Sequence, residues 1–289
     1  MSFKKQGTNQ AVVMGSLARD RVESQGRVDE RIGGVVWYAG ITLARLGVDA
    51  RVLTRISADD EIMAEALQAR GVDVAWRPAT RTTNFVNRYD VRLGHRTQFV
   101  PSVAEPIETA GAIEALGSAD LAYLGALHPA DLADDVVPVL NKTRPRIVAI
   151  DVQGYTRLIH RGKVIAGLDR RLPELLAVCS VIKANKDEAR LVTGLSDPED
   201  AARTLANPGR EALVTCGPDG AFVYYQGGRH YEPAVLTQIA DPNGAGDIFF
   251  AAYLAKRLDD ASVGAAASFA ADFTSKSLAS SDMTHFLHT

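Results

Sequence analysis

Short apolar runs alternate with amphipathic segments along most of the chain. The apolar runs that predict buried strands are residues 11–14, 49–55, 121–124, 147–150, 178–183, 212–216 and 221–225. Apolar residues at helical spacing predict helices at 35–46, 58–70, 107–116, 132–140, 173–177, 199–206, 248–257 and 262–278. Strands that alternate with helices are typical of a mainly parallel sheet covered by helices on both faces. We therefore expect an α/β fold.

Two stretches depart from this alternation. Residues 21–31 and 72–100 are polar, have β-type character and contain glycine turns. Antiparallel hairpins need a place outside a parallel sheet, so these stretches predict a small second sheet that closes over a substrate as a lid and excludes water. Edge hairpins without a gating role are the alternative. We expect one domain over residues 1–289, with lid segments at about 19–33 and 80–101.

The composition narrows the class of protein. The chain has 289 residues, of which 46% are hydrophobic, and a formal net charge of −3, so no basic surface is expected for nucleic acid or an acidic membrane. Residues 1–10 are polar and no apolar run reaches membrane length, which predicts a cytoplasmic protein. Cys179 and Cys216 lie in apolar, strand-like runs and are expected to be buried thiols in a reducing compartment.

The strongest chemical signal is the turn Asn243-Gly244-Ala245-Gly246-Asp247, which precedes an apolar helical run. Small residues at this position leave backbone N–H groups uncovered at the positive end of the helix dipole, which favours an anion such as phosphate. An aspartate in the first helical turn can then serve as a general base. The alternative is an ordinary helix start in which Asp247 only complements the dipole. The turn alone does not decide between the two.

Two motifs carry a resemblance to a known family. Residues 241–247 resemble the C-terminal Asp-Thr-x-Gly-Ala-Gly-Asp signature of the ribokinase (PfkB) family of sugar and nucleoside kinases, with Pro242 in place of threonine. Residues 31–47 resemble the family's second signature, a Gly-Gly pair followed by a small-residue helix that ends in Leu-Gly. The resemblance covers almost the whole chain. It implies a ribokinase-like fold with a β lid, and a kinase that uses ATP and Mg²⁺.

The same resemblance implies roles for the residues of the turn. Asp247 would remove the proton from a substrate hydroxyl, which attacks the γ-phosphate of ATP. The backbone N–H groups of the preceding turn would hold the charge that develops on the transferred group. The residues in this catalytic set are Asn243, Gly244, Ala245, Gly246 and Asp247.

Polar residues follow the predicted strands where open α/β sheets bind ligands, at the carboxyl edge. Asp20 follows the first strand, and Asp151 and Gln153 follow the strand at 147–150, so these side chains are candidates for binding hydroxyls. Solvated loop residues are the alternative. Arg157 is a candidate for steadying charge on the transferring phosphoryl group. The complete substrate-site set is Asp20, Gly33, Gly34, Asp151, Gln153 and Arg157.

The sequence leaves three hypotheses for the function open. Residues 151–154, Asp-Val-Gln-Gly, resemble the inositol-kinase branch of the family, which favours a myo-inositol-like polyol or a sugar. A nucleoside kinase is the alternative, with Phe85, Tyr89 and Phe99 as an aromatic clamp in the lid. A non-catalytic sugar or nucleotide sensor is the third, although a pure binder has no need of Asp247.

Two weaker motifs predict the residues that bind the phosphate donor and its Mg²⁺. Asn185 and Glu188 fit the family's Asn-x-x-Glu form, which implies that they organise Mg²⁺ near the phosphates; a first-turn helix carboxylate is the alternative. Thr215, Gly217 and Gly220 fit the Thr-x-Gly-x-x-Gly turn, which implies nucleotide contacts; a plain hairpin turn is the alternative. Neither a P-loop nor a Gly-x-Gly-x-x-Gly motif after the first strand is present, which disfavours those nucleotide-binding classes.

Two further expectations concern assembly and the C-terminus. The family resemblance implies a homodimer formed through the lid hairpins. His285 and His288 are compatible with a metal pair, but we interpret the end of the chain as an unstructured tail.

Overall fold

The structure is a computed structural model, and it describes residues 8–24, 26–90, 95–206, 209–235, 243–280 and 283–287. Asp241 and Pro242 of the C-terminal signature lie outside these residues, and so do His288 and parts of both predicted lid turns.

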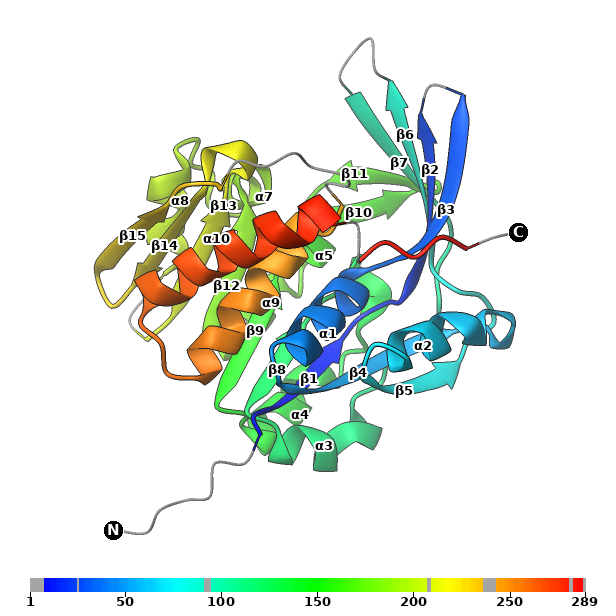
Figure 1. The fold of residues 1–289 in the computed structure, drawn as a ribbon, viewed down its shortest axis with the longest axis horizontal. Coiled ribbons are helices and arrows are strands. Elements are labelled where there is room, and N and C mark those ends of the chain that lie inside the picture. The colour runs from blue at the N-terminus through cyan, green and yellow to red at the C-terminus, as the bar shows by residue number, and fades with distance from the viewer. Residues whose placement is uncertain are drawn as a thin grey trace.

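The described residues contain a large sheet whose strands are β1 (Gln10–Met14), β4 (Asp49–Ile56), β5 (Asp73–Pro78), β8 (Leu121–Leu124), β9 (Ile147–Asp151), β12 (Val181–Asn185), β13 (Glu211–Thr215), β14 (Ala221–Tyr225) and β15 (Gly228–Glu232). Their order is β15-β14-β13-β12-β9-β8-β1-β4-β5 (Figure 1). Every neighbouring pair from β13 to β5 is parallel, whereas β14 and β15 pair antiparallel at one edge. The predicted fold class is confirmed.

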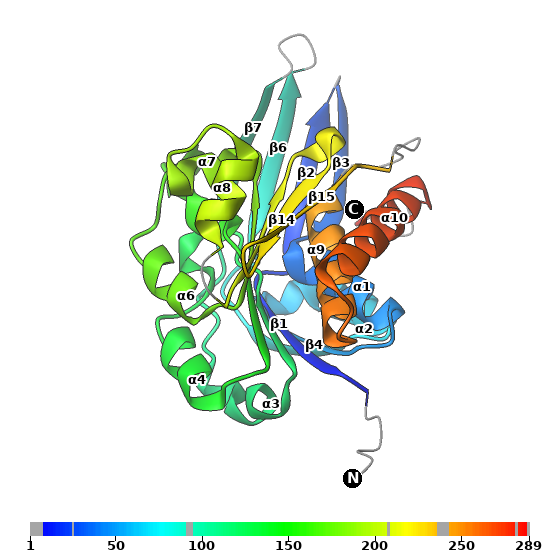
Figure 2. The ribbon, with the colours of Figure 1, turned by 90° about the vertical axis from the view of Figure 1, so that its left-hand side faces the viewer.

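Helices cover both faces of this sheet. Their bounds are α1 (Val35–Arg45), α2 (Glu61–Gln68), α3 (Ile113–Ser118), α4 (Val136–Thr143), α5 (Gln153–Thr156), α6 (Leu172–Val178), α7 (Lys186–Thr193), α8 (Pro198–Leu205), α9 (Ala245–Leu258) and α10 (Val263–Ser280). Figure 2 shows α1, α2, α9 and α10 on one side and α3, α4, α6, α7 and α8 on the other. Successive residues of a strand point into opposite cores. Val13 belongs to the core on the side of α1 and α9, and Val12 to the core on the side of α4 and α6.

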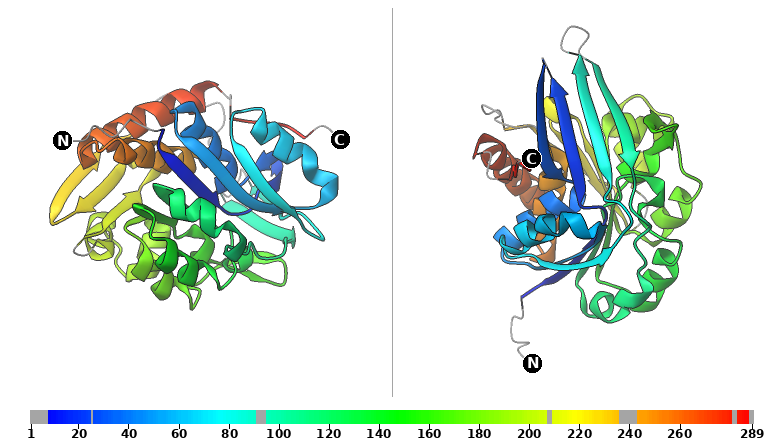
Figure 3. Two further views of the ribbon diagram at one scale, coloured as in Figure 1. Left: turned by 90° about the horizontal axis from the view of Figure 1, so that it is seen from below. Right: turned by 90° about the vertical axis from the view of Figure 1, so that its right-hand side faces the viewer.

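A second sheet stands off the large one at the end where its parallel strands finish (Figures 1 and 3). Its strands are β2 (Ala18–Ser24), β3 (Arg27–Gly33), β6 (Asn84–Asp90), β7 (His95–Ser102), β10 (Arg157–His160) and β11 (Lys163–Ala166), in the order β10-β11-β7-β6-β2-β3. The sequence predicted its first two hairpins. It missed the third, because its two strands are only four residues long and half-exposed, with adjacent rather than alternating apolar residues.

Three local predictions were wrong. The helix predicted at 107–116 begins only with a 3₁₀ turn at Ala110–Ala112, because Ile107 instead forms a bridge with Leu132. The strand predicted at 178–183 starts later, since α6 extends through Val178 and β12 begins at Val181. Cys179 therefore caps a helix, although both cysteines are buried free thiols as expected.

The C-terminal tail was also predicted wrongly. The amide of Ile32 donates to the carbonyl of His285, and the amide of Leu287 donates to the carbonyl of Glu30, so the tail lies along β3. The indole of Trp37 donates to the carbonyl of Met283. These backbone hydrogen bonds and the bond from the buried Trp37 indole hold residues 283–287 in place, although the composition of this segment predicted an unstructured tail. Within the described part of the chain, no cluster of three metal-binding side chains occurs, and no helix is long and apolar enough to span a membrane.

Candidate active site

The carboxyl ends of the parallel strands face a cavity of about 430 Å³ that the second sheet covers from the other side. Most of the predicted site residues line it: Asp20, Gly34, Gln153, Arg157, Asn185, Glu188, Thr215, Gly217, Asn243, Gly244, Ala245, Gly246 and Asp247. Residues from six separate segments of the chain thus meet in one place. Gly33, Asp151 and Gly220 do not line this cavity.

The start of α9 has the geometry of an anion cradle. Gly244 adopts a left-handed conformation (φ 76°), and a Cβ atom there would lie 2.4 Å from the ring of Tyr38, so only glycine fits. Within the described residues, the backbone N–H groups of Gly244, Ala245 and Gly246 donate no hydrogen bond. Uncovered amides at the N-terminus of a 14-residue helix favour a bound anion.

A buried ion pair that the sequence did not predict lies beside this cradle. Lys183 Nζ is 2.6 Å from Asp151 Oδ2, and the other oxygen of Asp151 accepts the amide of Gln153. Asp151 is fully buried and already satisfied, so it holds Lys183 instead of facing a ligand. A Cβ atom on Gly246 would be 3.1 Å from Lys183 Nζ, which puts the ammonium against the first turn of α9.

Lys183 brings a positive charge to the cradle. Burial alone would lower the pKa of its ammonium group, but Asp151 and the neighbouring carboxylates of Glu188 and Asp247 raise that pKa above the ordinary value. These carboxylates therefore favour the protonated, positively charged form of the side chain. The signal that could have revealed it was a lysine at the carboxyl end of an otherwise apolar parallel strand, two residues before Asn185.

Asp247 is partly buried in the cavity wall, and its environment changes its acidity. Burial, opposed by Lys183 and Arg157 and reinforced by Asp151 and Glu188, raises the pKa of this carboxyl to about 7. A carboxylate with this pKa is ionised in part at neutral pH and accepts a proton far better than an ordinary aspartate. It is the kind of perturbed group that marks functional sites.

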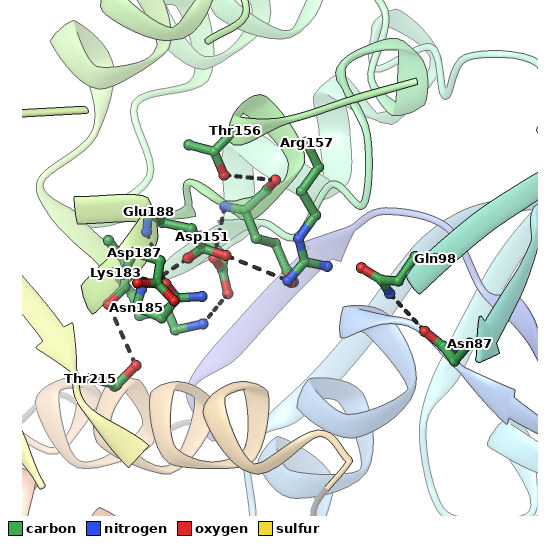
Figure 4. Close-up of polar contacts among 12 residues, drawn as sticks. Asn87, Gln98, Asp151, Thr156, Arg157, Lys183, Asn185, Asp187, Glu188 and Thr215 are labelled. Atoms are coloured by element: carbon green, nitrogen blue, oxygen red, sulfur yellow. Dashed lines mark hydrogen bonds and ion pairs between the residues drawn. The ribbon is translucent and has the colours of Figure 1, made fainter. Parts of the chain in front are cut away.

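Asn185 and Glu188 form a capping box at the start of α7. Asn185 Oδ1 accepts the amides of Asp187 and Glu188, while Glu188 Oε2 accepts the amide of Asn185. Glu188 is thus a first-turn helix carboxylate that caps α7, as the alternative interpretation of this motif predicted. Its other oxygen faces the cavity side, with Arg157 Nη2 at 3.4 Å, and burial raises the pKa of its carboxyl (Figure 4).

Two of the substrate-side candidates, Asp20 and Gln153, line the same cavity. Gln153 is 7% exposed, and its Nε2 has no hydrogen-bond partner among the described residues, so a buried donor awaits an acceptor. A Cβ atom on Gly33 would overlap Asp20 Oδ2 at 2.0 Å, which explains the glycine at this position. The second sheet also supplies Phe85, Asn87 and Gln98, which the sequence did not single out as a group.

A second, mostly apolar cavity of about 440 Å³ adjoins the cradle. It lies between the β13–β14 turn and α10, and Thr215, Gly217 and Gly220 line it together with Gly246. Gly220 has φ 84°, and a Cβ atom there would meet the carbonyl of Glu232 at 2.2 Å. The turn is therefore a hairpin connection that also borders a cavity.

The fold and the site define a class: an α/β protein with an anion cradle and a weakly acidic carboxylate at the carboxyl edge of its sheet. A family model described as "pfkB family carbohydrate kinase" matches residues 9–289. The chain belongs to this family of carbohydrate kinases, and the resemblance drawn from the motifs is confirmed.

The individual relatives share limited sequence identity with this chain or match only part of it. A 2-dehydro-3-deoxygluconokinase of Thermoproteus tenax is 35% identical over 79 residues, which is 26% of this chain and 24% of that protein. The structure of a pyrophosphate-dependent kinase in the ribokinase family, complexed with a pyrophosphate analog and myo-inositol, superimposes with a TM-score of 0.82 at 24% identity and covers 93% of this chain and 94% of that one. Arabidopsis thaliana ribokinase complexed with ribose and ATP gives a TM-score of 0.74 at 20% identity, covering 94% of this chain and 93% of that one.

Proposed function

We propose that the protein is a phosphotransferase that moves the γ-phosphoryl group of ATP to a hydroxyl of a small polyol or sugar, a myo-inositol-like ring first. The observation that carries the proposal is the first turn of α9. There a carboxylate with a pKa of about 7 adjoins three uncovered amides and the ammonium of Lys183, all in one cavity.

Each component has a chemical task in this reaction. Asp247 takes the proton of the substrate hydroxyl, whose oxygen forms the new bond to the γ-phosphorus while the bond from phosphorus to the β–γ bridging oxygen breaks and ADP leaves. The amides of the cradle, that of Asn243 included, hold the charge on the transferred group. Lys183 and Arg157 offset the same charge from either side.

Magnesium fits the residues present. Glu188 offers one oxygen outside its capping bond, and Asn185 adds an amide beside the cavity. Mg²⁺ retains several waters and takes one or two carboxylates plus phosphate oxygens, so a sparse protein shell is suitable. We propose that these two side chains hold the ion through water. When bound, it would neutralise charge on the donor phosphates.

The cavity side of the second sheet favours a polyol over a nucleoside. Asp20, Asn87 and Gln98 present hydroxyl-binding groups to the cavity. Of the three aromatics considered as a clamp, only Phe85 lines it, whereas Phe99 packs under the Arg88 guanidinium on the other face. The bound myo-inositol of the structural neighbour agrees with this choice. A nucleoside kinase is therefore the second candidate.

The apolar cavity beside the cradle supports ATP as donor, with Thr215, Gly217 and Gly220 next to the nucleotide. Thr274 lines this cavity and is 9% exposed, and its Oγ1 has no hydrogen-bond partner among the described residues, which suits recognition of a polar base edge. Pyrophosphate, the donor named for the structural neighbour, needs only the cradle and is the alternative.

We further propose that the chain works as one kinase domain with the second sheet as its lid. Buried, unpaired thiols suit the reducing cytoplasm. Dimerisation through the lid stays a prediction, which sedimentation analysis would test. The C-terminal tail already occupies Glu30 and Ile32 on the edge strand β3, so pairing there would use residues 27–29.

An acceptor panel tests the proposal. Inositols, pentoses, hexoses and nucleosides are each incubated with ATP or pyrophosphate and Mg²⁺, and phosphate esters are measured by phosphorus NMR. Asp247→Asn is expected to lower turnover of the best acceptor roughly 10²- to 10⁴-fold. Asp259→Asn, at the exposed far end of the same helix, is the control. Near-normal turnover by the Asp247 variant would refute the base assignment, and acceptor binding without any ester would favour the sensor.

A further inference from the structure

Four buried residues form a chain of hydrogen bonds where the second sheet joins the large one (Figure 1). Ser16 lies between β1 and β2, Thr83 directly precedes β6, Ala104 follows β7, and Asp131 lies in the connection after β8. Ser16 Oγ is 2.5 Å from Asp131 Oδ1 and 3.0 Å from Thr83 Oγ1. Thr83 Oγ1 accepts the amide of Ala104. These residues are at most 7% exposed, and none of the four lines the cavity.

The chemistry of these groups fixes the direction of the chain. An ionised carboxylate only accepts hydrogen bonds, so the hydroxyl of Ser16 donates to Asp131. The oxygen of Ser16 then accepts the proton of Thr83, whose own oxygen already accepts the Ala104 amide. The donors therefore all point one way, from the second sheet to a single carboxylate of the main body. In such an arrangement each hydrogen bond polarises and strengthens the next.

Asp131 also connects the chain to segments that line the cavity. Its second oxygen, Oδ2, accepts the amides of Leu127 at 2.8 Å and of Ser16 at 3.2 Å. Leu127 itself lines the cavity. So do Asp20, on the strand that follows Ser16, and Phe85 of β6. One buried carboxylate thus holds together three of the segments that line the cavity, and two of them belong to the second sheet, on the proposed acceptor side.

We propose that Asp131 is a positioning residue that sets the acceptor half of the active site through this chain. The inference rests on the proposed function. The donor half consists of the cradle of α9, Lys183 of β12 and the β13–β14 turn; within the described part of the chain, none of these hydrogen-bonds to the four residues. Breaking the chain therefore shifts the second sheet and its acceptor contacts, while the contacts to the donor phosphates remain. A purely structural anchor would lower stability without this difference between the two substrates.

The test compares two carboxylates of the same kind. Asp131→Asn replaces one acceptor oxygen by an NH₂ group, which cannot accept the Ser16 hydroxyl or a backbone amide. Asp135→Asn is the matched control, because Asp135 also accepts two backbone amides, those of Thr109 and Ala110, and does not line the cavity. The substrates are the acceptor and the donor with the highest kcat/KM in the panel above. The KM of each is measured with the other substrate saturating.

We expect Asp131→Asn to raise the KM of the acceptor at least about tenfold, which corresponds to the loss of one good hydrogen bond, and to leave the KM of the donor within about threefold. Asp135→Asn should leave both KM values within about threefold. Circular dichroism and thermal unfolding verify the fold of each variant. An unchanged acceptor KM in folded Asp131→Asn, or equal increases for acceptor and donor, overturns the inference alone.

A less disruptive pair of variants decides the question if Asp131→Asn does not fold. Thr83→Val keeps the shape of the side chain but removes the hydroxyl that joins Ser16 to the Ala104 amide, whereas Thr83→Ser keeps it. The acceptor KM should rise in Thr83→Val and stay near the native value in Thr83→Ser. The amides of β6 and β7 should exchange with deuterium faster in Thr83→Val alone, without any substrate present. Equal behaviour of the two variants refutes the positioning role. Failure of the proposed function looks different: the native protein then forms no ester with any acceptor, and the inference falls with it.

Discussion

Asp247 should make the folded protein less stable at alkaline pH, and its removal should reverse this. The pKa of its carboxyl is about 7 in the folded protein against an ordinary value of 3.8. The difference is about three pH units at about 1.4 kcal/mol each, so keeping this carboxylate ionised costs the fold about 4 kcal/mol. A group with a raised folded pKa contributes most to stability below its unfolded pKa. That contribution is lost as the pH rises from about 4 to 7.

The amide side chain introduced by Asp247→Asn does not ionise, so the variant resembles the protonated native protein at every pH. We therefore expect the free energy of unfolding of Asp247→Asn, relative to native protein, to increase by about 3–4 kcal/mol between pH 4 and pH 8.5. Urea unfolding followed by the fluorescence of Trp37 and Trp76 measures it, with unchanged m-values as the check for two-state behaviour. Asp259→Asn, at the other end of α9, is the control and should show no such increase.

The same experiment separates the two interpretations of this residue. If Asp247 merely complemented the helix dipole, its pKa would be lowered, and the asparagine variant would be less stable by about 0.3–1 kcal/mol at neutral and alkaline pH. A difference of that sign, or one that stays constant from pH 4 to 8.5, would refute the reasoning about a strained carboxylate held for catalysis.

Three further predictions concern the surroundings of this carboxylate. With the native protein, kcat/KM should rise with pH to a plateau above about 7, and Lys183→Met should move this limb to higher pH because the ammonium lowers the pKa of Asp247; a limb that stays in place would contradict the contact. Since Lys183→Met also leaves Asp151 buried without its partner, it should destabilise the fold by about 3–5 kcal/mol, and adding Asp151→Asn should recover part of this in urea unfolding. Gly244→Ala should lower kcat/KM by roughly 10²-fold, because its Cβ would displace the Tyr38 ring and the cradle with it. Gly47→Ala, with the same left-handed backbone but no atom within 4 Å of a Cβ, is the matched control and should lose stability but no activity.

Much of the site could be predicted because its signals are local. A glycine that needs a left-handed backbone, small residues before a helix and an acid in its first turn lie within Asn243–Asp247, and their consequences depend little on the rest of the chain. Likewise Asp20 and Gln153 follow apolar strands, and the edge at which parallel strands end is fixed by the α/β alternation itself. These residues do line one cavity.

Other features depended on partners distant in sequence. Asp151 looked like a ligand for hydroxyls, but it is 32 residues from Lys183, and only the parallel pairing of β9 and β12 brings them within 2.6 Å. The third hairpin of the second sheet and the docked tail carry little apolar periodicity and exist because β7 and β3 offer open edges.

The sequence by itself determined the alternation of strands and helices, the family signatures and the position of the base, because each is encoded in a few consecutive residues. The tertiary structure decided which charges meet, which amides face the cavity and which remain covered. Those properties arise from strand order and register, and the free energy of a buried charge depends on neighbours that the chain supplies from far away.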